Sequence, residues 1–351
     1  MEHFQLEKRS RTPHFEYVHC PLCKGEQSQL LLRSKDYNWG TPGVFKYVKC
    51  RGCGLVYENP RPTPDGIIQL YPRYYGTTIR DPSAAPEGKI NAPIHSVRAQ
   101  LIEHFVPAVP GSIFDIGCGS GFFLEFMRRR GWWVSGIDPS AEHIRYAKCS
   151  LGLRNIHYGS WPLDAGIRTQ VDVVTLFHVI EHIPSPVYAL SALKEVLRQG
   201  GIAVIETPNV ESWPTKLFGS RWVTLDAPRH VGLFSKQTLR YCLKKAGFEP
   251  LMLKTLSPST MEYTESIRYV LQDFGLRRYN KDPVASPSKS ETDKKRQTRG
   301  RFFYRNSLKR SCHKSEDLFF RGLNKLAALF DAGCNLLIVA QKPSTRKDIA
   351  A

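Results

Sequence analysis

Residues 112–125 read Ser-Ile-Phe-Asp-Ile-Gly-Cys-Gly-Ser-Gly-Phe-Phe-Leu-Glu, and this stretch decides the fold class. An apolar strand leads to Asp115, a loop with glycine at every second position follows, and a helix begins at Phe122. Glycines in such a loop let a ligand approach the backbone closely, while the helix N–H groups point toward it. The spacing Asp-x-Gly-x-Gly-x-Gly differs from the Gly-x-Gly-x-x-Gly of dinucleotide-binding folds. The stretch therefore predicts a strand–loop–helix unit that binds a small ligand.

A second acidic residue supports this interpretation. The next predicted strand covers residues 132–138 and ends in Asp138, 17 residues beyond Gly121. An acid at the end of the second strand of such a sheet is suited to bind two ribose hydroxyls. The ligand is therefore expected to contain a ribose.

The chain continues as an alternation of strands and helices. Residues 171–177 form a continuous, mainly apolar run rich in β-branched side chains, which is typical of a parallel strand buried on both faces. One helix is expected from Pro186 to a glycine stop at 200–201, and another follows the N-cap Ser235. Further strands are expected at 155–158, 202–206, 251–254 and 335–341. The pattern predicts an α/β fold with a doubly wound sheet.

Together these features resemble the class I S-adenosylmethionine-dependent methyltransferases, over roughly residues 95–255 and the final strand. The resemblance implies a Rossmann-like seven-stranded sheet with an antiparallel seventh strand, and S-adenosylmethionine as the cofactor. It implies that the glycine loop wraps the methionine part, that Asp138 binds the ribose and that residues 159–161 lie by the adenine. An acid is common in the family where this chain has Ser160. The implied cofactor-binding residues are Asp115, Gly117, Cys118, Gly119, Gly121, Asp138, Ser160, Trp161, Phe177 and His178.

Two histidines are candidates for a general base. Both follow strands at their carboxyl ends, where ligands of doubly wound sheets bind, and histidine titrates in the useful range. His230 is ranked first, because its surroundings resemble the substrate-side loop of sugar C-methyltransferases that also carry four N-terminal cysteines. His182 is second, because its Glu-His pair is similar to that of quinone-type O-methyltransferases. The alternatives are that Glu181 and His182 brace the following helix and that His230 only orders its loop.

Two Cys-x-x-Cys pairs stand near the N-terminus. Cys20 with Cys23 and Cys50 with Cys53 are separated by 26 residues, and short strands are expected between them at 30–39 and 44–50. Each pair forms a knuckle whose two sulfurs can bind one tetrahedral ion, so the four thiolates predict a closed, structural Zn²⁺ site. A segment of this size has too small a core to fold well alone, which gives the metal a structural role.

The same patterns divide the chain. We expect a zinc-ribbon-like domain at 1–60, a linker or lid at 61–94, a cofactor-binding core at 95–256, an insertion at 257–330 and the final core strand at 331–343. Tyr74 and Tyr75 are candidates to contact the cofactor or acceptor; the alternative is an ordinary linker. The insertion contains a basic segment at about 275–314, expected to be a mobile loop, and an apolar helix.

Composition limits the class of protein. The 351 residues include 41% apolar side chains, without a run of 18 that would span a membrane. The N-terminus lacks the apolar region of a secretion signal, and the nine cysteines are an odd number. These features favour the reducing cytoplasm over a disulfide framework.

The net charge of +18 is concentrated in one place. Residues 275–314 hold 13 basic and 3 acidic side chains. The segment is either a solvated loop or a contact with an anionic membrane surface or substrate, which would make the protein peripheral to a membrane. An RNA methyltransferase is the alternative function. It is disfavoured because no RNA-binding signature accompanies the ribbon, so nucleic acid is not expected as the partner. The expected acceptor is a small molecule, a sugar or glycan, or a lipid-linked compound, methylated on oxygen or carbon.

Overall fold

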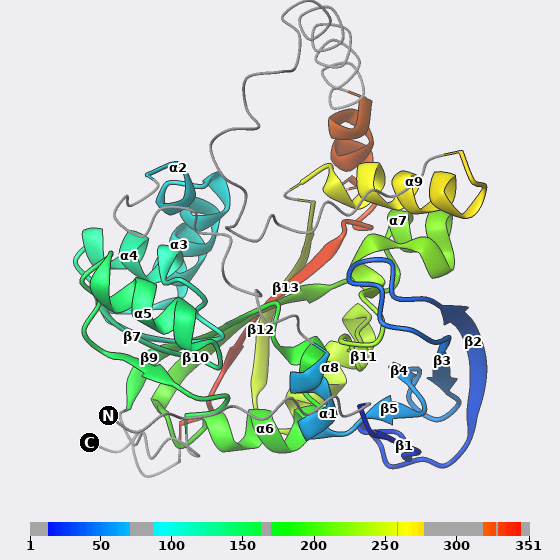
Figure 1. Ribbon diagram of the computed structural model, residues 1–351. Coiled ribbons are helices and arrows are strands. Elements are labelled where there is room, and N and C mark those ends of the chain that lie inside the picture. Colours follow the sequence, from blue (N-terminus) through cyan, green and yellow to red (C-terminus); the bar gives the residue numbers. More distant parts are fainter. Residues whose placement is uncertain are drawn as a thin grey trace, which may run out of the picture.

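The computed structural model describes residues 13–70, 87–162, 170–257, 259–276, 319–327 and 329–344, and its centre is a seven-stranded sheet (Figure 1). The strand order is β12-β13-β10-β9-β6-β7-β8. The strands are β6 (Ser112–Ile116), β7 (Trp133–Asp138), β8 (Ile156–Tyr158), β9 (Val171–Phe177), β10 (Leu197–Pro208), β12 (Glu249–Leu256) and β13 (Asn335–Gln341). β13 runs antiparallel to both its neighbours, and the pairs from β10 to β8 are parallel. The predicted fold class is confirmed.

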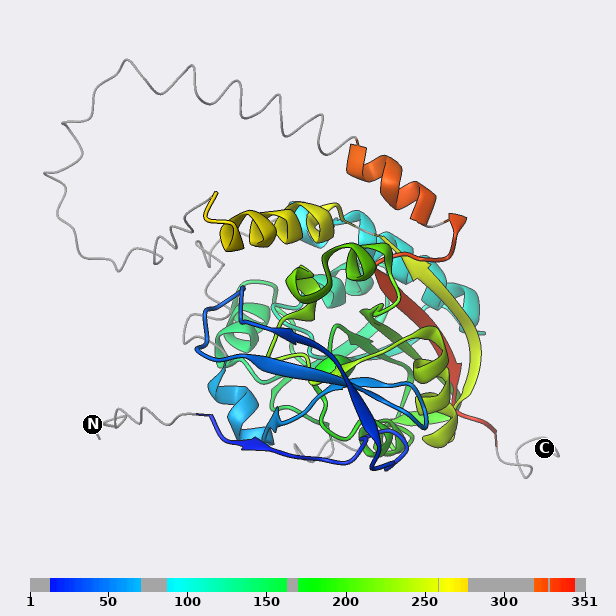
Figure 2. The same ribbon diagram turned by 90° about the vertical axis from the view of Figure 1, so that its right-hand side faces the viewer.

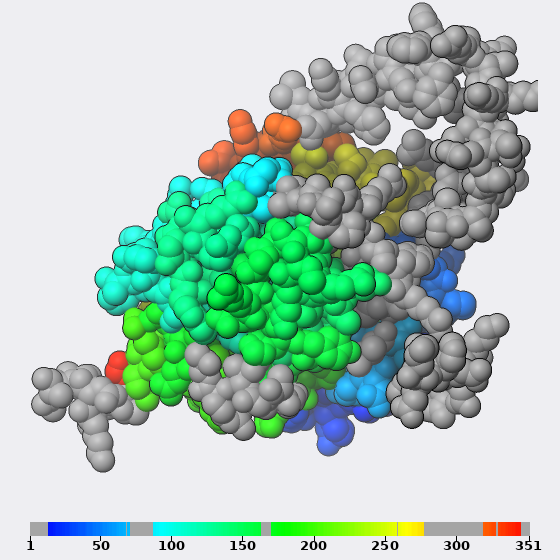
Figure 3. Space-filling view, turned by 60° about the vertical axis from the view of Figure 1, so that its left-hand side comes forward, coloured from blue at the N-terminus to red at the C-terminus, as the bar shows by residue number. Residues whose placement is uncertain are grey.

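Helices cover both faces of this sheet. α6 (Pro186–Leu193) and α8 (Lys236–Lys245) place their buried leucines in the core of one face. α3 (Pro93–Phe105), α4 (Phe122–Arg129) and α5 (Ala141–Cys149) cover the other. Successive residues of the central strand β9 point to opposite faces of the sheet, so Val173 and Val174 enter different cores. Figure 3 shows residues from about 90 to 160 as a continuous surface over the second face.

The helix predicted from Pro186 ends earlier than expected. α6 ends at Leu193, whereas a helix to residues 200–201 was predicted. Leu197 is fully buried and already pairs with Val171 in the sheet, ahead of an irregularity that lasts until Ile202. The chain therefore enters β10 before the glycines, because burying Leu197 in the sheet outweighs its helix propensity.

The N-terminal residues form a second sheet, in the order β11-β4-β3-β2. Its strands are β2 (Ser28–Ser34), β3 (Phe45–Cys50), β4 (Val56–Glu58) and β11 (Gly232–Leu233). β11 comes from the second half of the chain, so this sheet joins two distant segments. In Figure 2 the blue N-terminal strands lie across one side of the central sheet. A pair of two-residue strands, β1 (Phe15–Glu16) and β5 (Arg61–Pro62), lies beside them.

One predicted strand of this domain is shorter than expected. The apolar pattern suggested extended chain from residue 30 to 39, but β2 ends at Ser34. The side chain of Asp36 accepts hydrogen bonds from the backbone N–H groups of Trp39 (2.8 Å) and Thr41 (3.0 Å). A carboxylate that bonds its own backbone a few residues ahead turns the chain and ends the strand.

The remaining elements lie at the edges of the core. They are α1 (Pro64–Gln69), α2 (Glu87–Ile90), α7 (Trp213–Phe218), α9 (Met261–Asp273), a helix at 319–327, and the 3₁₀ turns η1 (Ile180–His182), η2 (Gly219–Arg221) and η3 (Val223–Leu225). The helix at 319–327 lies near one end of α9 (Figure 2), and the rings of Tyr263 and Phe320 stack with centroids 5.1 Å apart. Both precede β13 in the chain.

Some predictions concern residues that the structure does not describe. Tyr74 and Tyr75 of the expected lid lie outside the described residues, as does nearly all of the basic segment 275–314. Within the described parts of the chain, no helix combines the length and the apolar character needed to cross a bilayer.

Candidate active site

The glycine loop lies at the point where the strand order reverses. From β6 the chain passes to β7 and β8 on one side, then returns to β9 on the other side of β6. The carboxyl ends of β6 and β9 therefore open the crevice in which ligands of doubly wound sheets bind. The residues after β6 are the glycine loop, and those after β9 begin with His178.

The three glycines of the loop have different roles. All have left-handed backbone angles, with φ of 69° at Gly117, 54° at Gly119 and 79° at Gly121. A Cβ on Gly117 would lie 2.6 Å from Val179 Cγ2, and one on Gly121 would lie 2.6 Å from Leu153 Cδ1. A Cβ on Gly119 would meet nothing within 4 Å. Gly117 and Gly121 are thus needed for packing, whereas Gly119 faces open space where a ligand can approach the backbone.

Two carboxylates lie next to this loop, and one of them binds it directly. Asp138, at the end of β7, accepts hydrogen bonds from the backbone N–H of Gly119 (2.9 Å) and of Ser140 (2.8 Å). Asp115 is buried in β6 and accepts from Thr175 Oγ1 at 2.6 Å. Burial raises the pKa of Asp115 to about 7, against the smaller lowering effects of Thr175 and the Arg98 guanidinium. Asp138 therefore links the end of β7 to the glycine loop that follows β6.

The other predicted cofactor residues lie around the same crevice. Cys118 is buried in the loop. Ser160 and Trp161 follow β8 directly; Ser160 is exposed, and Trp161 is half-buried against the core. Phe177 packs edge-on against Phe123, with ring centroids 5.1 Å apart. The ten predicted cofactor-binding residues thus lie at or just after the carboxyl ends of β6, β7, β8 and β9.

His178 sits in an unusual backbone position. Its φ is 58°, a left-handed angle that is uncommon for a residue with a side chain. Its Nδ1 lies 3.4 Å from Glu181 Oε1 and its Nε2 lies 3.5 Å from Glu206 Oε1. Desolvation lowers the pKa of His178, but the two carboxylates outweigh it and raise the pKa to about 10. The two carboxylates therefore favour the protonated form of His178 at neutral pH, which does not suit a general base.

A buried ion pair, which the sequence did not point to, completes this corner. Arg98 of α3 contacts Glu206 of β10 at 2.7 Å. Its guanidinium also stacks over the ring of Phe177, 3.9 Å from the centroid. Glu206 further accepts a hydrogen bond from Asn335 Nδ2 of β13 at 2.7 Å. No local pattern marked Arg98, because its partners come from strands far away in the sequence.

The two histidines ranked as catalytic are brought into contact. The rings of His182 and His230 lie edge to face, with centroids 4.6 Å apart and planes at 76°. The ligand atoms of Glu181, His182 and His230 all lie within 4.8 Å of one another. His182 belongs to η1 after β9, and His230 belongs to the loop before β11. The fold thus joins into one cluster two motifs that the sequence only placed at the same sheet edge.

Backbone carbonyls orient both rings. His182 Nδ1 lies 3.1 Å from the carbonyl oxygen of Arg229, and His230 Nδ1 lies 2.7 Å from that of Thr224. A carbonyl oxygen only accepts, so each Nδ1 carries the proton and each Nε2 keeps its lone pair in the neutral ring. Burial, followed by the charge of His230, lowers the pKa of His182 to about 4. His182 is therefore neutral at pH 7.

The surroundings of Glu181 differ from those of a residue that caps the following helix. It is fully buried and accepts a hydrogen bond from Thr207 Oγ1 at 2.9 Å. Burial raises its pKa, but the hydrogen bond with His178 and the neighbouring histidine charges outweigh this and lower the pKa to about 2. Ser185, not Glu181, is the N-cap residue of α6. Glu181 is a charged member of the cluster and does not cap that helix.

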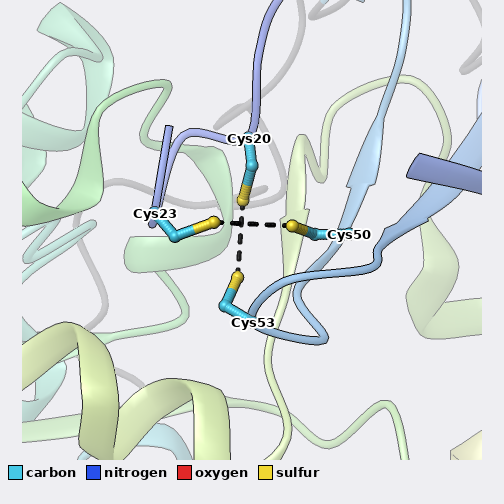
Figure 4. A group of neighbouring side chains, drawn as sticks. All are labelled: Cys20, Cys23, Cys50 and Cys53. Atoms are coloured by element: carbon cyan, nitrogen blue, oxygen red, sulfur yellow. Dashed lines mark hydrogen bonds between the residues drawn. The ribbon is translucent and has the colours of Figure 1, made fainter. Parts of the chain in front are cut away.

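The four N-terminal cysteines meet at one point (Figure 4). The Sγ atoms of Cys20 and Cys53 are 3.5 Å apart, as are those of Cys23 and Cys50, and the two pairs cross. A tetrahedral Zn²⁺ with Zn–S bonds of about 2.3 Å requires S···S separations of about 3.8 Å. The four sulfurs lie within 4.8 Å of one another, so the residues fit such an ion.

Comparisons with known proteins agree with this geometry. A family described as "Methyltransferase domain" matches residues 91–253. A ubiquinone biosynthesis O-methyltransferase of Psychrobacter cryohalolentis is 33% identical over 120 residues, which cover 32% of this chain and 47% of that protein. One of the same name from Cereibacter sphaeroides is 30% identical over 166 residues, which cover 44% of this chain and 67% of that protein. The chain thus spans about half the length of the first of these relatives.

A solved structure was also found to be similar. A SAM-dependent methyltransferase from Archaeoglobus fulgidus aligns with 77% of this chain and all of its own, at 18% identity and a TM-score of 0.43. The family match, the relative from Cereibacter sphaeroides, the strand order and the glycine loop at the switch point agree with one another. The chain belongs to the class I S-adenosylmethionine-dependent methyltransferases.

Proposed function

We propose that the protein transfers the methyl group of S-adenosylmethionine to a small-molecule acceptor, with His230 as the general base. The observation that carries this proposal is the cluster of His230, His182 and Glu181 beside the crevice of the glycine loop. Such a cluster supplies a proton acceptor next to the cofactor site, which methylation of a hydroxyl or an activated carbon needs.

The two histidines are not equally suited to act as the general base. An efficient base has a pKa near the working pH. With its pKa lowered to about 4, His182 holds a proton too weakly to serve well. His230 lies against it with Nε2 as the acceptor atom, because its Nδ1 is bonded to the carbonyl of Thr224. This favours His230 as the base and His182 as a neighbour that shapes the site.

The other residues have binding roles. When bound, the cofactor supplies an electrophilic methyl group on a positively charged sulfur. We propose that the loop from Asp115 to Gly121 holds its methionine part, that Asp138 binds the ribose hydroxyls and that Ser160 and Trp161 lie by the adenine. Phe177 and His178 border the same crevice. The protein's main task is then to align the acceptor in line with the methyl group, while His230 Nε2 takes the acceptor's proton.

The relatives support oxygen as the acceptor atom. The matched proteins of Psychrobacter cryohalolentis and Cereibacter sphaeroides are named ubiquinone biosynthesis O-methyltransferases. We therefore rank a small-molecule hydroxyl first, and a sugar carbon or a lipid-linked hydroxyl next. The similarity of the His230 loop to that of sugar C-methyltransferases keeps carbon as the alternative.

The test combines cofactor binding and methyl transfer. Calorimetry with S-adenosylmethionine should show one site per chain. Cofactor with a tritiated methyl group, offered with dihydroxybenzenes, sugar nucleotides or lipid extracts, should label one of these acceptor classes. His230→Ala should lower labelling by at least about 100-fold without loss of cofactor binding, and His104→Ala, on the exposed side of α3, should label as wild type. Absence of cofactor binding would refute the proposal at its base.

RNA methylation is the competing proposal. It would use the four-cysteine domain and the basic segment 275–314 to bind RNA. A total RNA pool in the same labelling experiment decides between them. Label in RNA at a rate equal to that of the best small molecule would reverse our ranking.

We further propose one structural Zn²⁺ per chain at Cys20, Cys23, Cys50 and Cys53. The sulfur geometry supports it, and four thiolates leave no open position for chemistry. Elemental analysis should find about one zinc per chain in the wild type and little in Cys50→Ser. Cys149→Ser is the matched control, because Cys149 is exposed on α5 and outside the cluster.

Contact with a membrane surface is a proposal that extends the lipid-linked acceptor. Apolar side chains at the ends of the insertion helices are strongly exposed, among them Phe274 (72%), Phe319 (63%) and Phe330 (69%). They flank the basic segment, and such a combination favours anionic bilayers. Co-sedimentation with vesicles containing phosphatidylserine should exceed that with neutral vesicles. Equal recovery of the protein with both kinds of vesicle would contradict the proposed membrane contact.

A further inference from the structure

Arg229 connects the four-cysteine domain to the histidine cluster. Its side chain is fully buried, and its guanidinium binds both oxygens of Asp36 (Nη1 to Oδ2, 2.9 Å; Nη2 to Oδ1, 2.8 Å). It also binds both oxygens of Asp226 (3.0 and 2.7 Å). The backbone carbonyl of Arg229 accepts the hydrogen bond from His182 Nδ1. One residue is therefore held by the N-terminal domain through its side chain and orients a histidine through its backbone.

Asp36 is itself held rigidly in place. Besides Arg229, its carboxylate accepts hydrogen bonds from the backbone of Trp39 and Thr41 and from Thr41 Oγ1 at 2.6 Å. These bonds and the guanidinium lower the pKa of Asp36 despite its burial, so the carboxylate is charged at neutral pH. A two-point contact between a planar guanidinium and a fixed carboxylate sets both distance and orientation.

The same domain contacts His230 directly. Tyr47 is fully buried and donates its hydroxyl to the carbonyl of His230 at 2.9 Å. Tyr47 belongs to β3, the strand that ends at Cys50 of the sulfur cluster. The next strand, β4, pairs with β11, which begins just after the His230 loop. The domain that carries the four cysteines therefore holds this loop on two sides.

We infer that Asp36 is a positioning residue for the pair of His182 and His230, which it acts on through Arg229. The four-cysteine domain then has a role in the reaction beyond covering the site. The inference rests on the proposed function of His230, because a positioned base is meaningful only if the base is used. Asp36 contacts neither histidine itself. It holds Arg229, whose backbone carbonyl orients His182 and which directly precedes His230 in the chain.

The first test reads the histidine rings without an assay of activity. In the full-length protein with ring-¹⁵N histidine, wild-type His182 and His230 should each show one tautomer, protonated at Nδ1. In Asp36→Asn, an amide N–H₂ replaces an acceptor of Arg229, and the single tautomer of His182 should be lost or averaged. Signals of the surface histidines and the affinity for S-adenosylmethionine should stay unchanged. Asp65→Asn, an exposed aspartate of α1, is the matched control.

The second test uses a double-mutant cycle on the rate of methyl transfer. Small misplacement of reacting groups can lower a rate by about 100-fold, so Asp36→Asn should lower kcat by about that factor and change KM little. In a His230→Ala background the same substitution should cost nothing more, and Asp36→Glu should restore part of the loss.

The outcomes separate the two proposals. If His230→Ala keeps full activity, the proposed base is wrong. If the losses of Asp36→Asn and His230→Ala multiply, or if the His182 signal is unchanged in Asp36→Asn, the positioning role is wrong. Should Asp36→Asn fail to fold, Thr41→Val, which removes one hydrogen bond to Asp36, is judged by the same ring signals and the same criteria.

Discussion

His182 and His230 stand edge to face, with ring centroids 4.6 Å apart, although they come from loops that follow different strands. Each ring donates Nδ1–H to a backbone carbonyl, which fixes the orientation of both rings. Burial, followed by the charge of His230, lowers the pKa of His182 to about 4, so His182 holds a proton only weakly at neutral pH. This relationship decides which substitution should affect the proton transfer.

His230→Ala should lower kcat by about 10²- to 10⁴-fold, the usual contribution of a general base. His182→Asn keeps a side-chain N–H toward Arg229 and should lower kcat by a smaller factor. Steady-state kinetics of both variants with the acceptor identified by labelling checks this order. Equal losses would show that the pair works as one unit, and a larger loss in His182→Asn would reverse the assignment.

The glycines of the loop should separate stability from cofactor affinity. Gly117→Ala and Gly121→Ala place a Cβ 2.6 Å from Val179 or Leu153, so both should unfold at clearly lower urea concentrations. Gly119→Ala meets no protein atom and should cost only about 1–2 kcal/mol for its left-handed angle. Its affinity for S-adenosylmethionine should nevertheless fall the most relative to its stability loss. Calorimetry beside urea unfolding measures both, and unchanged affinity in Gly119→Ala would contradict the placement of the cofactor.

Asp115 should make stability depend on pH in a defined window. Its pKa rises from an ordinary 3.8 to about 7 in the folded protein, so the folded state binds the proton more tightly than the unfolded state. This group therefore destabilises the fold progressively as the pH rises from about 4 to 7, by up to about 4 kcal/mol. In Asp115→Asn that loss is absent, and the amide oxygen of the new side chain can still accept from Thr175.

The measurement compares urea unfolding of wild type and Asp115→Asn in cofactor-free protein between pH 4 and 7.5. The stability of the variant relative to wild type should increase with pH over this range. A constant difference would mean that Asp115 keeps its ordinary pKa.

Removal of the proposed Zn²⁺ should affect the reaction more than cofactor binding. Chelation or Cys50→Ser frees the end of β3, and Tyr47 in that strand holds the carbonyl of His230. We expect loss of the N-terminal sheet and at least a tenfold fall in kcat, with S-adenosylmethionine affinity within about threefold of the wild type. Circular dichroism, calorimetry and activity on the same samples check this, with Cys149→Ser as the control. Full activity in the metal-free protein would show that the domain is dispensable.

The local features of this protein were readable from the sequence alone. The glycine loop, the acid of Asp138, the β-branched run of β9 and the two Cys-x-x-Cys pairs depend on spacing within a few residues, and the structure has them where they were expected. Even the antiparallel final strand was found some 80 residues after its neighbour, because its apolar run has no other place in the fold.

The tertiary structure alone decided what these features contact. Local propensity continued the helix after Pro186 to the glycines, but burial of Leu197 in the sheet ended it at Leu193. No pattern near Asp36 indicated Arg229, because the two lie 193 positions apart and meet only when the N-terminal sheet takes β11 as its fourth strand. Sequence spacing determines strands, turns and ligand knuckles, since their bonds are local. The charges around the histidines are set by folding, because burial and long-range partners determine their pKa values.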